Sequence, residues 1–298
     1  MKILARALSV LALSALAVPG GCMQMEQGTT LFPDGSGKIT MKIAFKKSML
    51  KMLEGFAKGF GADPGADPPA APTDPLQELT NPESLAKNSE GIAAWKIGKK
   101  EEEGEWIRLT NVGYFEDVNK VKIYQTQQQP GAPPGEKTLA FAAKYEKTAD
   151  GYVLRLTDDS RKELGEIPGA GPGAPGAADA ELGKAMLEMM KPMLQDLKVT
   201  LSITVPGPIQ EAQGFLEKKE RTAVIAFDGA MIIELAGNPE GEKAKKLKSL
   251  AEVKEGKITW TENQVTDAET AAFKKEMAEA KEAWTKALEE AKKKSTKE

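Results

Sequence analysis

Short segments in which every second residue is apolar recur along the chain, and this period of two limits the fold more than any other feature. Ile39, Met41, Ile43 and Phe45 alternate with mostly polar neighbours, as a strand with one buried face requires. Turn residues at 33–37 and 148–151 separate such segments and predict hairpins. Further strands are predicted over 93–98, 107–109, 139–145, 152–156, 199–205, 222–227 and 257–261. We therefore expect an antiparallel sheet built from hairpins.

Segments with apolar residues three or four apart predict helices between the strands, over 49–60, 82–87, 179–194 and 242–250. The clearest helix follows the capping-box sequence Thr266-Asp267-Ala268-Glu269 and carries Phe273, Met277 and Trp284 on one apolar stripe. The expected fold class is α+β: an antiparallel sheet of hairpins with several packed helices and a long, charged, amphipathic C-terminal helix over 265–298.

Three stretches rich in Gly, Ala and Pro interrupt the periodicity, at 59–75, 130–136 and 168–178. They offer too little apolar side chain to offset the entropy lost on ordering, so we expect disordered loops. The strand pattern is alike on both sides of each stretch. This favours insertions into a single domain over 22–264 rather than boundaries between domains.

The composition excludes several kinds of catalytic site. The 298 residues include no histidine and one cysteine, so neither a Ser-His-Asp nor a Cys-His nucleophile system can form. The formal net charge of −3 gives no long-range attraction to nucleic acid, and no phosphate-binding glycine loop follows a strand. We expect a protein that is not an enzyme, with no cofactor and no nucleic-acid partner.

Three acidic segments are better explained by turns and solvated strands than by metal or acid–base chemistry. Asp34-Gly35-Ser36-Gly37 lacks the other ligands of a calcium loop and predicts a hairpin turn. Glu101-Glu102-Glu103 predicts a solvated hairpin tip. Glu116 and Asp117 are adjacent on a strand and would face opposite ways, which argues against a general acid and base pair.

The N-terminus has the features of a secretory signal peptide over 1–21. Lys2 and Arg6 precede the apolar run Ala7–Val18, which is too short to span a bilayer. Cys22, the single cysteine, follows this run behind Pro19-Gly20-Gly21. This placement resembles a bacterial lipobox, although Pro19 stands where that family usually has Leu.

The lipobox resemblance implies cleavage before Cys22, followed by acylation of its sulfur and its new amine. Such acyl chains would hold the protein on a membrane of the bacterial cell envelope. Met23 replaces the Asp that resembles an inner-membrane retention signal, which favours the outer membrane in a Gram-negative cell. The alternative is cleavage after Ala15-Leu16-Ala17, which would release a soluble protein.

The stretch Val199–Phe227 is similar to the end of the LppM-type bacterial lipoprotein domain. It has a strand ending in Val205-Pro206-Gly207-Pro208-Ile209, then Gln213-Gly214, then a strand closing on Phe227. Gln213 and Phe227 stand where that family has Asn and Trp. The start of the mature chain is also similar, with Cys22, then a strand and the Asp34-Gly35-Ser36-Gly37 turn. Together the two parts cover about 60 residues, and the resemblance implies a small α+β envelope domain that recognises lipids or lipoglycans without catalysis.

Two functional hypotheses follow. In the first, a membrane-anchored, non-catalytic lipoprotein binds an envelope partner or an apolar, lipid-like ligand on the methionine-rich surface of Met186, Met189, Met190 and Met193, although helical spacing also suits core packing. In the alternative, the protein is a structural or oligomerising envelope component whose C-terminal helix docks on a partner through Phe273, Met277 and Trp284. The pattern favours packing of that stripe on the protein's own sheet over this role.

Overall fold

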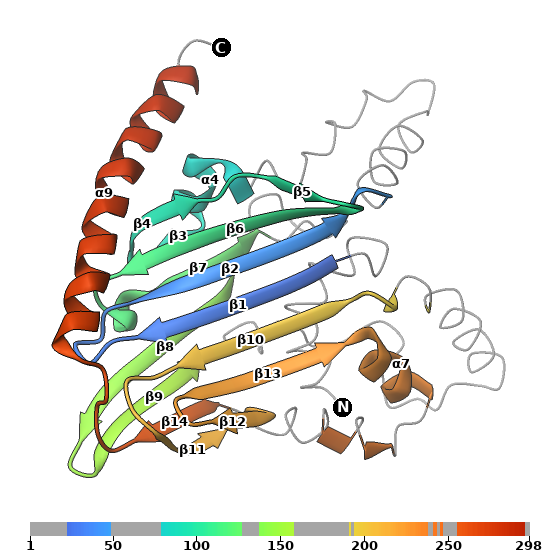
Figure 1. Ribbon diagram of the computed structural model, residues 1–298, viewed down its shortest axis with the longest axis vertical. Helices are drawn as coiled ribbons and strands as arrows, with labels where there is room; N and C mark the ends of the chain where they lie inside the picture. The colour runs from blue at the N-terminus through green and yellow to red at the C-terminus, as the bar shows by residue number, and fades with distance from the viewer. Residues whose placement is uncertain are drawn as a thin grey trace.

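A computed structural model describes residues 23–48, 79–126, 137–157, 194–237 and 255–295, together with residues 191, 241, 242, 245 and 246. These residues form two β-sheets with a long helix at one end (Figure 1). The fold class is α+β, dominated by strands. The predicted signal peptide, Cys22 and the three Gly/Ala/Pro-rich stretches lie outside the described residues.

The eight-stranded sheet, called the large sheet below, confirms the predicted N-terminal hairpin. β1 pairs antiparallel with β2, and β2 pairs antiparallel with β6. The strand order is β12 (Glu217–Lys219), β13 (Thr222–Asp228), β10 (Lys198–Thr204), β1 (Met23–Leu31), β2 (Gly37–Lys46), β6 (Trp106–Phe115) and β4 (Ile92–Ile97), and β5 (Glu101–Glu103) also pairs with β6. β1 begins at Met23, directly after Cys22.

The prediction of a wholly antiparallel sheet is wrong at the centre of the large sheet. β1 pairs in parallel with β10, from Gln24 opposite Lys198 to Thr30 opposite Thr204. Alternation and turn residues reveal which neighbours in sequence form hairpins, but a parallel partner is reached only through a long connection. The pairing of strands so far apart in sequence is therefore invisible to a local pattern.

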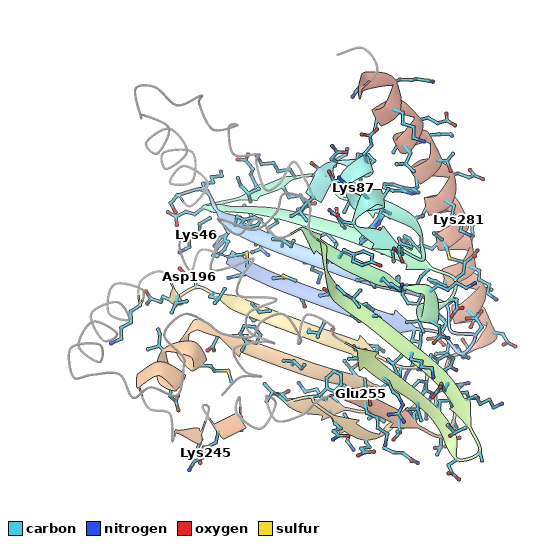
Figure 2. The ribbon with its side chains drawn as sticks, turned by 180° about the vertical axis from the view of Figure 1, so that it is seen from behind. Lys46, Lys87, Asp196, Lys245, Glu255 and Lys281 are labelled. Carbon is cyan, nitrogen blue, oxygen red and sulfur yellow. The ribbon has the colours of Figure 1, made fainter. Side chains whose placement is uncertain are left out.

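The six-stranded sheet, called the small sheet below, packs against one face of the large sheet. Its order is β11 (Ile209–Gln213), β14 (Gly256–Trp260), β9 (Gly151–Thr157), β8 (Lys137–Thr148), β7 (Lys122–Thr126) and β3 (Ser89–Glu90). The predicted turn at 148–151 joins β8 to β9. Viewed from behind, the small sheet lies in front of the part of the large sheet nearer the long helix (Figure 2). Leu31, Ile39 and Ile203 from the large sheet pack with Leu154, Ile258 and Trp260 from the small sheet.

In the described residues the α-helices with defined bounds are α4 (Pro82–Lys87), α7 (Gly229–Gly237) and α9 (Asp267–Ser295). α4 and α9 confirm two predicted helices, while α7 was not predicted. Several packed helices are therefore an overstatement for this part of the chain, because sheet-on-sheet packing buries much of its apolar surface. The predicted helices over 49–60, 179–194 and 242–250 lie wholly or mostly outside the described residues. No helix among those residues is long and apolar enough to cross a membrane.

Candidate functional site

Five residues proposed from the sequence lie outside the described part of the chain. They are Cys22 and the methionines Met186, Met189, Met190 and Met193. The structure nevertheless constrains the surroundings of Cys22, because Met23 is already paired with Phe45 in the large sheet and is buried. A site near Cys22 is therefore a site at this end of the sheet.

The partner-helix residues Phe273, Met277 and Trp284 lie in the protein's own core. They are 3%, 8% and 8% exposed, and they pack with Leu85, Ala94, Trp95 and Tyr114. The ring of Phe273 stacks on that of Phe32, with 4.1 Å between centroids. The alternative that the stripe is a free docking surface is therefore corrected, because residues of β4, β6 and α4 cover it within the chain.

Polar contacts hold α9 to the end of the large sheet where β2 begins and β6 ends. Tyr114 donates a 2.6 Å hydrogen bond to Glu276, and the Lys38 amine lies 3.0 Å from the other Glu276 oxygen. Partial burial alone would raise the pKa of Glu276. The hydrogen bond from Tyr114 and the ion pair with Lys38 outweigh it and hold that pKa below its usual value.

The three acidic segments take the structural roles expected of them. Asp34 accepts a 3.1 Å hydrogen bond from the Ser36 amide in a turn where Gly35 has a φ of +83°. Glu101–Glu103 form the exposed strand β5 beside β6. Glu116 and Asp117 follow the end of β6 and are not on a strand, contrary to the prediction. Glu116 forms an ion pair with Lys281 of α9, whereas Asp117 accepts from the Asn119 amide. Each acid therefore has a local contact or is solvated.

The opposite end of the large sheet is defined here by its strand ends Met23, Lys46, Lys198 and Asp228, and is called the N-terminal end below. Lys46 and Asp196 lie at this end and Lys281 of α9 lies at the other (Figure 2). Since β1 has nine residues, the two ends are about 30 Å apart.

The inner face of the large sheet, which is the face toward the small sheet, is apolar at this N-terminal end. Alternation places Met23 and Met25 of β1 on this face, beside Ile43 and Phe45 of β2. On the other side of β1, Val199 and Leu201 face the same way, as do Ile225 and Phe227 of β13. Met25, Ile43, Leu201 and Ile225 are only half-buried. The row therefore offers apolar surface that a ligand could cover further.

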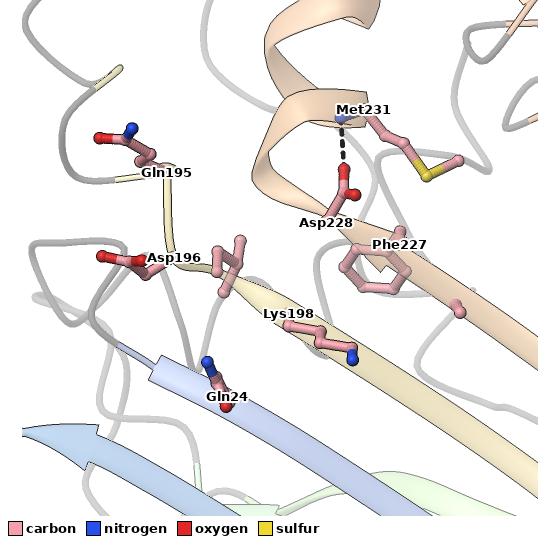
Figure 3. Close-up of a pocket in the computed structure, with 9 residues that line it drawn as sticks. Gln24, Gln195, Asp196, Lys198, Phe227, Asp228 and Met231 are labelled. Atoms are coloured by element: carbon pink, nitrogen blue, oxygen red, sulfur yellow. Dashed lines mark hydrogen bonds between the residues drawn. The ribbon is translucent and has the colours of Figure 1, made fainter. Parts of the chain in front are cut away.

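A pocket of about 410 Å³ opens at the strand ends beside this apolar row (Figure 3). Gln24, Lys198 and Asp228 lie opposite one another across β1, β10 and β13, on the outer face of the sheet. Leu197 and Phe227 contribute from the buried side, and Met231 contributes from α7. The pocket thus joins charged groups of the outer face to apolar groups of the inner face.

The charges around the pocket differ in how far they are compensated. Asp196 forms an ion pair with Lys46, whose amine also lies 5.4 Å from the centre of the Trp106 ring. Asp228 accepts a 2.8 Å hydrogen bond from the Met231 amide and so caps α7. Lys198 has no ion pair among the described residues. Among the described residues, the pocket therefore has one unpaired cation, Lys198, and one carboxylate, Asp228, whose second oxygen accepts no hydrogen bond.

Sequence reasoning missed Gln24, Lys198 and Asp228 as members of a site. Gln24 and Lys198 are far apart in sequence and meet only through the parallel pairing of β1 with β10. The one signal available beforehand was the position of Gln24, two residues after Cys22. It suggests proximity to an anchor but no chemistry.

Comparison with known proteins finds a weak structural likeness and no match in sequence. No family model matches it, and no curated protein does. Among solved structures it is similar to the NMR structure of the folded domain of LppM from Mycobacterium tuberculosis, with 7% sequence identity and a TM-score of 0.31, over 82% of this chain and 93% of the other. A likeness at this level assigns no function to the chain.

Proposed function

We propose that this protein is a non-catalytic lipoprotein of the bacterial cell envelope, anchored by acyl chains on Cys22, which binds an apolar, lipid-like ligand at the N-terminal end of the large sheet. One observation carries the proposal. β1 begins at Met23, directly after Cys22, so no linker separates the acylated residue from the apolar inner face.

The absence of a linker brings a bilayer and a binding surface together. Acyl chains on Cys22 would enter the membrane next to Met23, and Met25 and Ile43 follow on the same face of the sheet. A lipid leaving the bilayer at this point would reach half-buried apolar side chains without crossing open water. Covering each additional Å² of apolar surface contributes roughly 25 cal/mol. The lack of histidine in the whole chain supports binding over catalysis.

The anchor is tested by replacing Cys22 with serine and separating membranes from soluble fractions. We expect the wild-type protein in the membrane pellet with the added mass of its acyl chains. The C22S variant should lose both, because serine cannot receive the thioether-linked diacylglycerol. Equal retention of C22S in the pellet would refute the lipid anchor, while retention of a Thr200→Gln variant would show that an ordinary surface change leaves anchoring intact.

The ligand surface is tested by a matched pair of adjacent substitutions on β10. Leu201 faces inward between Gln27 and Ile225, whereas Thr200 faces outward. Each is changed to glutamine in the full-length protein, and phospholipid retained after detergent purification is quantified by mass spectrometry. We expect L201Q to retain several-fold less lipid, because an amide replaces apolar contact surface, and T200Q to retain the wild-type amount. Lipid retention that is equal in both variants, or absent from the wild type, would contradict the proposal.

A further inference from the structure

We infer that the pocket at the N-terminal end binds the head group of a phospholipid that carries a primary ammonium beside its phosphate, such as phosphatidylethanolamine. This inference rests on the proposed function and adds the head-group chemistry. The pocket lies where the apolar row ends, so a ligand with its acyl chains on the inner face would place its polar head there.

Lys198 is the group suited to the phosphate. It is exposed, lines the pocket and has no ion pair among the described residues, so its three N–H donors are free for an anionic oxygen. Lys46, the other cation nearby, already pairs with Asp196. Gln24 lies directly across from Lys198 on β1, where its amide can donate to the same phosphate.

Asp228 is the group suited to the ammonium. It lies opposite Lys198 on β13, but no ion pair joins the two, and Figure 3 shows their charged ends pointing apart. One carboxylate oxygen of Asp228 caps α7 through the Met231 amide, and the other has no partner among the described residues. Lys198 and Asp228 are neighbours that do not pair with each other. They therefore match a zwitterionic head group, which carries one positive and one negative charge.

The apolar lining explains why a lipid fits better than a free head group. Leu197 and Phe227 are buried, and the side chain of Met231 lies at the pocket as well. The volume of about 410 Å³ is within the range of small-molecule sites. The glycerol and the first methylenes of the acyl chains would lie against Met231 and continue toward Leu201 and Ile225, which are half-buried.

The head-group preference distinguishes this lipid from others in a membrane. A choline head group has no N–H donor for Asp228, and a glycerol head group has no positive charge. Charge-assisted hydrogen bonds are about twice as strong as neutral ones, so we expect phosphatidylethanolamine to bind about tenfold more tightly than phosphatidylcholine or phosphatidylglycerol with the same acyl chains.

Native mass spectrometry of the full-length protein in a nonionic detergent provides the test. The three lipids are titrated separately, and free phosphoethanolamine is added as a competitor. Asp228→Asn should remove the preference for phosphatidylethanolamine over phosphatidylcholine while keeping the α7 cap, because asparagine is an equally good capping residue. Lys198→Gln should weaken all three lipids, and Lys275→Gln on the exposed face of α9 should change nothing.

Each result bears on the inference. Equal binding of the three lipids, or an unchanged preference in both pocket variants, overturns the head-group assignment and leaves the proposed lipid binding in place. Displacement of the lipid by an equal concentration of free phosphoethanolamine overturns the role of the apolar lining. If the wild type binds no lipid, the proposed function itself fails. Lys198 is exposed, so its variant keeps the test valid even if the Asp228 variant does not fold.

Discussion

Thr29 lies on the inner face of β1, opposite Ile39 on one side and Ile203 on the other. It is 2% exposed, and its hydroxyl has no hydrogen-bond partner among the described residues. Burying an unpaired hydroxyl costs free energy that the packing around it has to offset. At the scale of single residues, the Thr29 hydroxyl therefore lowers the free energy of unfolding of the large sheet.

We expect Thr29→Val to increase the free energy of unfolding by about 1 kcal/mol, because valine fills the same space without the polar group. Urea denaturation of the full-length protein measures the change. Thr204→Val is the matched control, since the Thr204 and Thr222 hydroxyls lie 3.0 Å apart and bond across the outer face. That variant should gain nothing. A loss of stability in T29V would show that the hydroxyl does have a partner.

The helix α9 shows, at the scale of one element, how an amphipathic pattern is used. Its stripe packs on β4 and α4, and three ion pairs flank that contact: Lys38 with Glu276, Lys274 with Asp34, and Lys281 with Glu116. Surface pairs of this kind contribute little one by one. Glu276 differs because it also accepts the Tyr114 hydrogen bond from inside the contact.

We expect the attachment of α9 to weaken in acid through Glu276. Its pKa in the folded protein is below the ordinary value of 4.5, so its contribution to stability is fully present above pH 4.5 and is lost as the pH falls through the folded-state pKa. Urea midpoints measured at neutral pH and at steps below pH 4.5 should fall less for Glu276→Gln than for the wild type. Glu279→Gln, on the exposed side of α9, should follow the wild type. Identical slopes in E276Q and the wild type would exclude this role.

At the scale of the whole molecule, the large sheet sets the distance between the proposed anchor and α9. Cys22 adjoins one end of β1, and α9 packs at the other end, about 30 Å away. α9 has 29 residues and is therefore about 43 Å long. It stands across the strand ends opposite the start of β1 (Figure 1).

This separation can be measured with dyes, because acylation would leave an introduced cysteine as the single free thiol. Ser48→Cys, near the end of β2, and Ala272→Cys, on the exposed side of α9, are labelled in turn and the protein is placed in vesicles containing an acceptor lipid. We expect strong energy transfer from position 48 and weak transfer from position 272. Equal transfer from both would mean that the sheet lies flat on the membrane or that the anchor is elsewhere.

The sequence predicts the parts of this fold that are local. The alternation over 39–45, the 148–151 turn and the stripe through Phe273 each specify a structure from neighbouring residues. The β1–β10 pairing depends on which distant strands share a face, and the pattern of β1 alone does not contain that information. The pocket follows from the same pairing, so Lys198 carried no signal as a site residue. Cys22 and the four methionines remain predictions.

The position of β1 between β2 and β10 also determines when the sheet can be completed. Its first partner follows within a few residues, but its second, Lys198–Thr204, is synthesised more than 160 residues later. Until that segment leaves the ribosome, the edge of β1 that later pairs with β10 exposes its backbone N–H and C=O groups. An export pathway that keeps the chain unfolded in transit would protect this strand from pairing with other molecules before its own partner arrives.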